Sequence, residues 1–208
     1  MTNSQQTVFI VDDDEGVRDA LSMLLGTIGQ AHELFASAAE FLESYDESKG
    51  GCLVLDIRMP RMSGLDLQEK LNEKGSLLPI IFITGHGDIL MAVEAMRRGA
   101  LDFIRKPFRD QDLLDRINEA LDFNAGKRKA LLDRQQLLSK IALLSEREGE
   151  VFHRVADGEM NKVIAFDLGI SERTVEVHRS QVMKKLGVRT LAQLVRIKIE
   201  AELPVSSD

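Results

Sequence analysis

The stretch CLVLDIRMPRMSG, residues Cys52–Gly64, decides the fold of the first half of the chain. Its first four residues, Cys52–Leu55, are apolar and suit a strand buried in a sheet. This run leads directly into a carboxylate, Asp56, and Pro60 follows four positions later. A carboxylate at the end of a buried strand is costly unless a cation or hydrogen-bond donors stabilise it, so we expect other parts of the chain to place such groups near Asp56.

Short apolar runs alternate with amphipathic segments over the first 122 residues. Ser37 with Glu40 has the pattern of a capping box, and Gly99 after Arg97 and Arg98 is a C-terminal stop. Five β–α repeats imply a doubly wound α/β fold, a parallel sheet with helices on both faces. The strands are predicted at 7–11, 32–36, 52–55, 79–84 and 102–106, and the helices near 15–27, 37–46, 64–74, 88–98 and 110–122.

The alternation stops after residue 122, and the rest of the chain predicts helices only. Residues 123–144 contain no proline and repeat leucine and isoleucine at helical spacing, which predicts a long helical linker; a disordered tether is the alternative. Ser145 with Glu148 has the pattern of a second capping box, and Asn161 is a candidate cap for the next helix. We therefore expect an α/β domain at 1–122, a linker at 123–144 and an all-α domain at 145–208.

The formal charge is distributed unevenly along the chain. Residues 1–122 carry 12 Lys and Arg against 22 Asp and Glu, a balance of −10, whereas residues 123–144 carry 5 against 1, a balance of +4. Residues 160–199 are also basic, with 8 against 3, which gives +5. An acidic front favours a cation as partner and a basic back favours nucleic acid, although most charge runs are simply solvated faces.

The cysteine content and the hydropathy of the chain indicate the cellular compartment in which the protein is expected. Cys52 is the only cysteine, so no disulfide can form within the chain. No apolar run approaches the roughly 18 residues of a membrane span. The first residues have neither the basic nor the apolar region of a secretory signal. We expect a cytoplasmic protein.

Polar residues end several of the predicted strands. The first strand ends in Asp12–Glu15, the central one in Asp56 and the next in Thr84, and the last runs into Lys106–Pro107. Ligands collect at the carboxyl ends of strands in an open parallel sheet, so these residues are expected to converge. Carboxylates brought together repel each other unless a cation neutralises them. All-oxygen ligation suits Mg²⁺, which commonly binds beside phosphate, and Lys106 and Thr84 would help to hold a phosphoryl group on Asp56.

Four motifs, VFIVDDDEGVRDAL, LVLDIRMPRMSGLDL, FITGHGD and GALDFIRKPF, resemble bacterial response-regulator receiver domains over residues 7–122. The resemblance implies a flavodoxin-like fold with five parallel strands in the order 2-1-3-4-5. It implies that Asp56 attacks a phosphohistidine of a sensor kinase, so the chain phosphorylates and slowly dephosphorylates itself but is not otherwise an enzyme. The implied roles are Mg²⁺ binding by Asp12, Asp13, Asp56 and the Arg58 carbonyl, phosphoryl contact by Thr84 and Lys106, a cis Lys106–Pro107 bond, and a switch formed by Thr84 and Phe103; Asp14 matches no fixed role.

Other features refine or oppose this interpretation. Gly85 leaves room for phosphate beside Thr84, and we hypothesise that His86 tunes the lifetime of the acyl phosphate. A haloacid-dehalogenase-like phosphatase also uses an aspartyl nucleophile and Mg²⁺, but it requires D-x-D, whereas Asp56 is followed by Ile57 and Arg58. No G-x-x-x-x-G-K-[ST] or G-x-G-x-x-G stretch supports nucleotide binding, and no H-E-x-x-H spacing supports a zinc site.

The segments NKVIAFDL and SERTVEVHRSQVMKKL are separated by a short turn that contains Gly169, which is a helix-turn-helix pattern. On the second helix Val177 is expected to be exposed among polar residues, which fits a major groove, where a valine can contact a thymine methyl. A solvated helix with one stray valine is the alternative. The core-facing stripe is Val175, His178, Val182 and Leu186, and the opposite face carries Arg173, Glu176, Val177, Ser180 and Lys184.

Residues 144–197, which begin LSEREGE and end LAQLVRI, resemble the LuxR-type DNA-binding domain of the FixJ/NarL class. The resemblance implies that Glu176, Val177 and Ser180 approach base edges. Glu176 either accepts from cytosine N4 or orients a neighbouring arginine, Arg179 or Arg173. Because one helix covers a half-site, specific binding calls for a dimer with half-sites about one helical turn apart or a multiple of it. The implied phosphate-positioning residues are Lys162, Thr174, Arg179 and Lys184, and His178 is structural.

Together the two resemblances imply a two-component transcription regulator. Phosphorylation of Asp56 is expected to promote homodimerisation through residues 88–122 and binding to double-stranded promoter DNA, with the sensor kinase and RNA polymerase as further partners. We expect it to activate a catabolic operon, for which styrene breakdown is one candidate. Two alternatives stay open: the helical end binds protein or RNA instead of DNA, and the inactive form is compact, with the first domain covering Val177, rather than extended and controlled by dimerisation.

Overall fold

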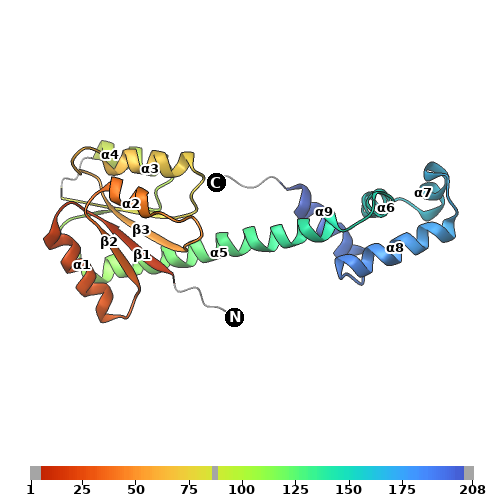
Figure 1. Ribbon diagram of the computed structural model, residues 1–208, viewed down its shortest axis with the longest axis horizontal. Helices are drawn as coiled ribbons and strands as arrows, with labels where there is room; N and C mark the ends of the chain where they lie inside the picture. The colour runs from red at the N-terminus through yellow and green to blue at the C-terminus, as the bar shows by residue number, and fades with distance from the viewer. Residues whose placement is uncertain (1–5, 86–88, 204–208) are drawn as a thin grey trace. The chain divides into compact units, whose positions relative to one another are not determined.

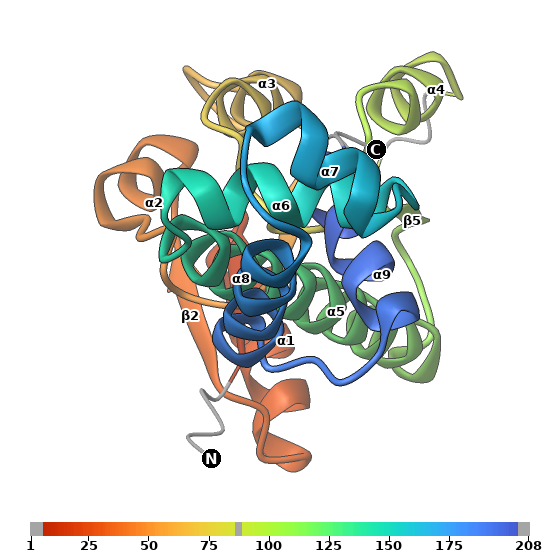
Figure 2. The same ribbon diagram turned by 90° about the vertical axis from the view of Figure 1, so that its right-hand side faces the viewer.

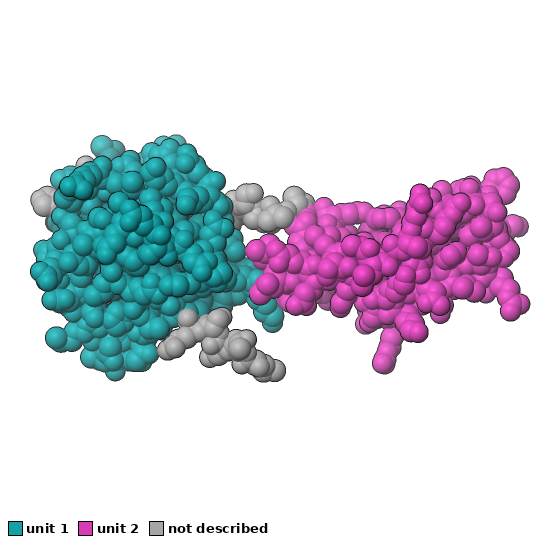
Figure 3. All heavy atoms as spheres, viewed as in Figure 1, with its two compact units in different colours: residues 1–129 teal, residues 130–208 magenta. Residues whose placement is uncertain are grey.

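The computed structural model describes residues 6–85 and 89–203. The chain divides into two compact units, residues 1–129 and 130–208 (Figure 3). Helix α5, Asp110–Ala142, begins in the first unit and ends in the second. The predicted linker at 123–144 is therefore continuous helix as far as Ala142, and the disordered alternative is wrong.

The first unit is a five-stranded parallel sheet with helices on both faces (Figure 1). The strand order is β2-β1-β3-β4-β5, which confirms the order that the resemblance implied. The strands are β1 (Thr7–Val11), β2 (His32–Phe35), β3 (Gly51–Asp56), β4 (Ile80–Thr84) and β5 (Asp102–Arg105). The helices are α1 (Glu15–Thr27), α2 (Ala38–Ser44), α3 (Gly64–Glu73), α4 (Ile89–Arg97) and the first part of α5.

Side chains of the central strands alternate between two hydrophobic clusters. On β3, Leu53 and Leu55 face one cluster, and Cys52 and Val54 face the other. Helices α2, α3 and α4 pack on the first face of the sheet and α1 and α5 on the second. Because both faces are covered, the central strands are continuous apolar runs rather than alternating ones.

Polar side chains fix α5 to the sheet beyond residue 122, where we expected the first domain to end. Asn124 is fully buried. Its Oδ1 accepts a hydrogen bond from the Gly51 amide at 3.0 Å, and its Nδ2 donates to the Leu77 carbonyl at 2.7 Å. One turn later Arg128 donates to three carbonyl oxygens of the loop before β3, those of Glu47, Ser48 and Lys49. The start of β3 and the helix are thus held together by hydrogen bonds.

The second unit is helical and packs around one core (Figure 2). Helix α8 contacts α6 and α7, and α6 also contacts α9. Leu137 and Ile141 of α5 pack against this core. Arg134 of α5 donates to the carbonyl oxygens of Ala201 and Leu203 at the end of α9, where helical carbonyls lack partners. The helices are α6 (Glu146–Ala156), α7 (Asn161–Leu168), α8 (Glu172–Leu186) and α9 (Leu191–Glu202).

The helix ends of the second unit agree with the sequence at one predicted cap and differ at another. Ser145 and Glu148 form the predicted capping box. Asn161 does not cap α7: Met160 is the N-cap residue and makes no side-chain capping bond. Asn161 is instead the first helical residue, and its side chain accepts a hydrogen bond from Arg179.

None of the helices in the described part of the chain combines the length and the hydropathy that crossing a bilayer demands.

Candidate functional site

Four of the predicted site residues lie where neighbouring strands end. Asp12 follows β1, Asp56 and Thr84 are the last residues of β3 and β4, and Lys106 follows β5. These strands are adjacent and parallel, so their ends meet at one edge of the sheet. Lys106 Nζ lies 2.7 Å from Asp12 Oδ2 and 3.1 Å from Asp56 Oδ1. A single ammonium group therefore bridges two carboxylates.

Burial makes this cluster electrostatically unusual. Asp12 is 1% exposed and Asp56 is 7% exposed. Burial raises the pKa of Asp56, the Lys106 ammonium opposes that shift, and the charge of Asp12 adds to it. Burial alone would lower the pKa of Lys106, but its bonds and charge interactions with Asp12 and Asp56 raise it overall. The ammonium is thus held charged between two carboxylates with little access to water.

Backbone amides hold both carboxylates in place. The Asp14 amide donates to Asp12 Oδ1 at 3.0 Å, and the Arg58 amide donates to Asp56 Oδ2 at 2.7 Å. Arg18 of α1 donates from Nη1 to the Asp12 carbonyl at 2.8 Å. Lys106 and the two backbone amides fix the direction in which each carboxylate points, and Arg18 holds the backbone of Asp12.

Gly64, the first residue of α3, is a site feature that the sequence reasoning missed. A Cβ at this position would lie 2.3 Å from the Asp56 carbonyl oxygen and 3.0 Å from the Phe82 ring. The Gly64 amide also donates to the Ile57 carbonyl at 2.8 Å. The chain therefore packs α3 directly against the residue that carries the carboxylate, and only glycine leaves room for that approach.

The acidic run after β1 divides into different roles. Asp13 is exposed beside buried Asp12. Asp14, for which the resemblance gave no role, is the N-cap of α1 and accepts hydrogen bonds from the Gly16 and Val17 amides. In residues 6–85 and 89–203, no three acidic, histidine or cysteine side chains come together in a group able to hold a metal ion.

The remaining predicted receiver residues lie on β4, β5 and the loops after them. Thr84 is 2% exposed, and Phe103 is partly buried against the cluster on the α2–α4 face. The Lys106–Pro107 bond is cis, as the resemblance implied. A Cβ on Gly85 would meet no atom of the described residues within 4 Å. His86 lies outside the described residues.

The helix-turn-helix presents the expected face to solvent. Helix α7 ends at Gly169, which has φ 65°, and α8 begins after its N-cap Ser171. On α8 the stripe of Val175, Val182 and Leu186 is buried, whereas Val177 is 54% exposed. Of the other predicted contact residues, Lys162, Arg173, Glu176, Ser180 and Lys184 are exposed, and Thr174 and Arg179 are partly buried, as is His178.

Two basic residues of α8, Lys185 and Arg179, form hydrogen bonds with other residues of the second unit. Lys185 Nζ lies 2.6 Å from Glu148 Oε2 and donates to the Leu143 carbonyl at 3.1 Å. The hydrogen bonds from Lys185 and from the Ser145 backbone lower the pKa of Glu148 to about 2. Arg179 Nη1 donates to Asn161 Oδ1 at 2.5 Å.

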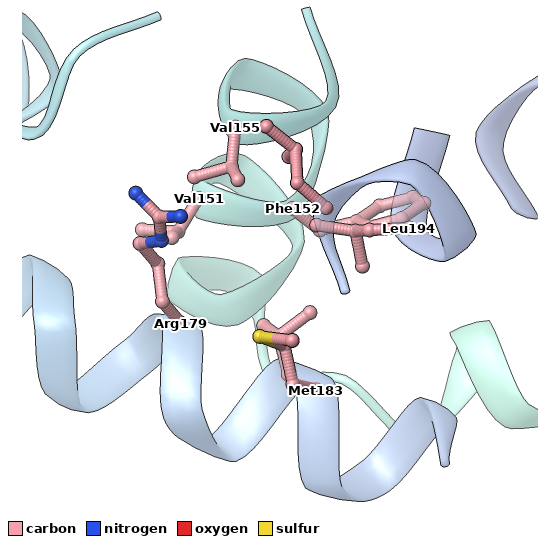
Figure 4. A pocket seen from close by; sticks show the side chains of 8 residues that line it. Val151, Phe152, Val155, Arg179, Met183 and Leu194 are labelled. Atoms are coloured by element: carbon pink, nitrogen blue, oxygen red, sulfur yellow. The ribbon is translucent and has the colours of Figure 1, made fainter. Parts of the chain in front are cut away.

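Arg179 also lines a small pocket between α6, α8 and α9 (Figure 4). The guanidinium lies beside Val151 of α6, and Phe152, Val155 and Leu194 line the same pocket. Arg179 is the one charged residue in the lining of this pocket, and the other lining residues are apolar.

A parallel sheet with bridged carboxylates at its edge, followed by a helical unit with a helix-turn-helix, defines the class of response regulators with a DNA-binding output. The chain belongs to this family: residues 8–118 match the response regulator receiver domain, and residues 142–198 match the luxR family of bacterial regulatory proteins. It is a two-component transcription regulator with a LuxR-type DNA-binding domain.

Similar proteins span nearly the whole chain. Response regulator protein TmoT of Ectopseudomonas mendocina is 46% identical over 95% of this chain and 90% of its own length. Transcriptional regulatory protein TdiR of Thauera aromatica is 44% identical over 93% of this chain and 86% of its own length. The low-resolution structure of response regulator StyR matches with a TM-score of 0.87 and 48% identity, over 94% of this chain and 99% of that one.

Proposed function

We propose that Asp56 accepts a phosphoryl group from a histidine of a sensor kinase and that this modification controls promoter binding. The observation that carries the proposal is the nearly buried Asp56 carboxylate, oriented by the Arg58 amide and facing Lys106. In the transfer, an Asp56 oxygen forms the P–O bond while the P–N bond breaks and the histidine nitrogen keeps the electron pair. Lys106 offsets charge on the phosphoryl oxygens, and the Thr84 hydroxyl is the proposed hydrogen-bond donor.

Two of the proposed Mg²⁺ ligands, Asp12 and Asp56, converge at this edge, and the third carboxylate, Asp13, is exposed beside them and would have to turn toward the ion to complete the set. Asp12 and Asp56 share one ammonium, so the cluster keeps an excess negative charge that favours a cation. We assign ligation to the carboxylates of Asp12, Asp13 and Asp56 and to the Arg58 carbonyl. The remaining positions would go to water, which suits Mg²⁺ because this ion keeps several of its waters. When bound, Mg²⁺ would neutralise charge on the transferring phosphoryl group.

Thr84 and Phe103 are the proposed switch. Phosphorylation adds about 1.5–2 negative charges to Asp56. Thr84 ends β4, and β4 pairs with β5, which carries Phe103, so a shift at the phosphoryl group reaches Phe103 through adjacent strands. Driving the population from 1:99 to 99:1 requires a preference of about 5.5 kcal/mol, which a charge-assisted network in a nearly buried site is able to supply.

The active form is proposed to be a homodimer that joins through the face of residues 88–122. Exposed apolar side chains on α4 support this surface: Ile89 and Leu90 are each 79% exposed, Val93 is 50% exposed and Met96 is 45% exposed. Apolar side chains gathered on one exposed helix are typical of an interaction site. RNA polymerase is the further proposed partner, and activation of a catabolic operon, with styrene breakdown as a candidate, is the proposed output.

The solvent face of α8 is proposed to read double-stranded DNA in the major groove. Glu176, Val177 and Ser180 would approach base edges, and the half-exposed Val177 would contact a thymine methyl. Two such helices in a dimer would read half-sites about one helical turn apart or a multiple of it. The proposed backbone-contacting residues are Lys162, Arg173, Thr174 and Lys184.

Intact mass and solution size test the phosphorylation. The full chain is incubated with acetyl phosphate and Mg²⁺ beside an Asp56→Asn variant. We expect one added phosphoryl group and a shift to dimer, both absent from the variant and both reduced without Mg²⁺. A folded wild-type chain that gains no phosphoryl group from either acetyl phosphate or a kinase extract would contradict the proposal, as would equal labelling of Asp56→Asn.

Selection from a random duplex pool tests the DNA-binding output. The phosphorylated chain should enrich a sequence with two related half-sites. Enrichment of RNA in a parallel pool, or no enrichment of any duplex, would favour the alternative in which the helical unit binds RNA or protein.

A further inference from the structure

Two basic side chains attach the recognition helix α8 to the rest of its unit. Arg179 donates to Asn161 Oδ1 at the start of α7, at 2.5 Å. Lys185 contacts Glu148 of α6 at 2.6 Å and the Leu143 carbonyl, which follows α5, at 3.1 Å. Both bases therefore bind partners within the same unit, Arg179 in a partly buried position and Lys185 at the surface.

The position of Arg179 around α8 differs from that of the exposed residues. At 3.6 residues per turn, Arg179 lies about 40° from the buried Val175 and about 160° from Val177. Its side chain runs toward Val151 of α6, on the core side of the helix (Figure 4). A guanidinium on this side points away from the surface that Val177 presents.

The two attachments lie at different levels of the helix. Arg179 and Lys185 are six residues apart, which is about 9 Å along the axis. One attachment joins α8 to α7 and the other joins it to α6 and to the end of α5. These two fixed points add to the buried stripe of Val175, Val182 and Leu186 and restrict both the rotation and the tilt of the helix more than either would alone.

We propose that Arg179 and Lys185 are positioning residues that orient α8 and do not themselves contact DNA. The inference rests on the proposed reading of DNA by α8. It gives Arg179 a different role from the phosphate contact that the sequence resemblance implied. Affinity for a specific sequence then depends on these bonds within the unit, whereas the salt dependence of binding comes from exposed bases on the DNA-facing side, such as Lys162, Arg173 and Lys184.

Salt dependence separates a positioning residue from a phosphate contact, because each phosphate contact contributes about 0.9 to the slope of log affinity against log salt. The full chain and its variants are titrated with the duplex that the wild type selects and with a scrambled duplex, at several salt concentrations. Lys184→Met, the matched control, should lose about 0.9 of the slope and weaken on both duplexes. Arg179→Met and Lys185→Met should weaken on the selected duplex by about tenfold with an unchanged slope.

Asn161 gives a test that leaves Arg179 in place. Asn161→Ala should reproduce the effect of Arg179→Met. Asn161→Asp keeps the acceptor, so it should retain the wild-type preference for the selected over the scrambled duplex, while its added negative charge beside Lys162 weakens binding to both. The double variant Asn161→Ala/Arg179→Met should bind no more weakly than the weaker single variant, since both changes remove the same bond. The comparison of Asn161→Ala with Asn161→Asp remains informative if Arg179→Met fails to fold.

The outcomes distinguish this inference from the proposed function. A loss of about 0.9 in slope for Arg179→Met, or wild-type affinity for Asn161→Ala, overturns the positioning role while leaving DNA binding intact. Failure of the wild type to select any duplex overturns the proposed function, and the positioning role with it.

Discussion

Replacing Lys106 with methionine should leave Asp12 and Asp56 facing each other without a cation. Lys106 Nζ lies 2.7 and 3.1 Å from carboxylates of residues that are only 1% and 7% exposed. Removing one partner of a buried ion pair costs about 3–5 kcal/mol of unfolding free energy. Because the Lys106 side chain is itself 22% exposed, we expect the lower end of that range, about 3 kcal/mol, at neutral pH.

The cost of Lys106→Met should depend on pH. Burial already raises the pKa of Asp56, and the substitution removes the group that lowers it. A carboxyl group whose folded-state pKa is raised contributes its stability at low pH and loses that contribution as the pH rises through the folded-state value. The variant should therefore approach wild-type stability near pH 4, the ordinary range of an aspartate, and fall below it toward pH 7.

Tyr45 makes the assay specific to the first unit. It is the only tyrosine, tryptophan is absent, and its ring lies 5.4 Å from that of Phe41. Urea unfolding followed by tyrosine fluorescence should show the midpoint of Lys106→Met lowered by about 1–2 M at pH 7. Lys49→Met is the matched control, because the exposed Lys49–Glu33 pair should contribute at most about 1 kcal/mol. A loss below about 1 kcal/mol for Lys106→Met, or an equal loss at every pH, would refute the reasoning.

Three further substitutions test other parts of the structure. Gly64→Ala places a methyl group 2.3 Å from the Asp56 carbonyl oxygen, so acetyl phosphate should label it about 10–100-fold more slowly by intact mass; a wild-type rate would contradict the packing argument. Asn124→Ala leaves a buried amide and a carbonyl without their partner and should cost about 3 kcal/mol in the Tyr45 urea assay, whereas a cost under 1 kcal/mol would show that water replaces the side chain. Glu148 has a pKa lowered to about 2 from 4.5, so its contribution is full above pH 4.5 and is lost as the pH falls toward 2. The difference in melting temperature between the wild type and Glu148→Gln, measured by circular dichroism, should shrink across that window, and a constant difference would oppose the assignment.

The receiver fold could be predicted because its signals are local and repeated. Short apolar runs at 7–11, 52–55 and 79–84 mark the central strands, and each of them ends in polar residues that can form one site. Asp12, Asp56, Thr84 and Lys106 are separated widely in the chain, yet parallel strands place their ends at one edge. The Lys106 bridge to both carboxylates follows from that placement, although its distances do not.

Features that depend on tertiary packing could not be predicted in this way. The need for glycine at position 64 arises from the approach of α3 to the Asp56 carbonyl, which leaves no periodic signal. Asn161 has the residue type of a helix cap, but the nearby Arg179 takes its side-chain oxygen. Arg128 and Arg134 looked like part of a basic run open to solvent or nucleic acid, whereas both bind backbone carbonyls within their own units. Net charge depends on residue type alone, so it does not distinguish these internally bound arginines from exposed ones.

The hydrogen bonds of α5 also determine where this protein can be cut and rejoined. An excised receiver that stops at Asp122 would lack Asn124 and Arg128, and the first residue of β3 and the loop before it would lose their hydrogen-bond partners. An output unit that starts after Arg134 would lack the side chain that binds the end of α9. A chimera that exchanges either unit with that of another regulator should therefore be joined between Lys129 and Asp133. A junction in this part of α5 keeps the hydrogen bonds that each unit makes to the helix.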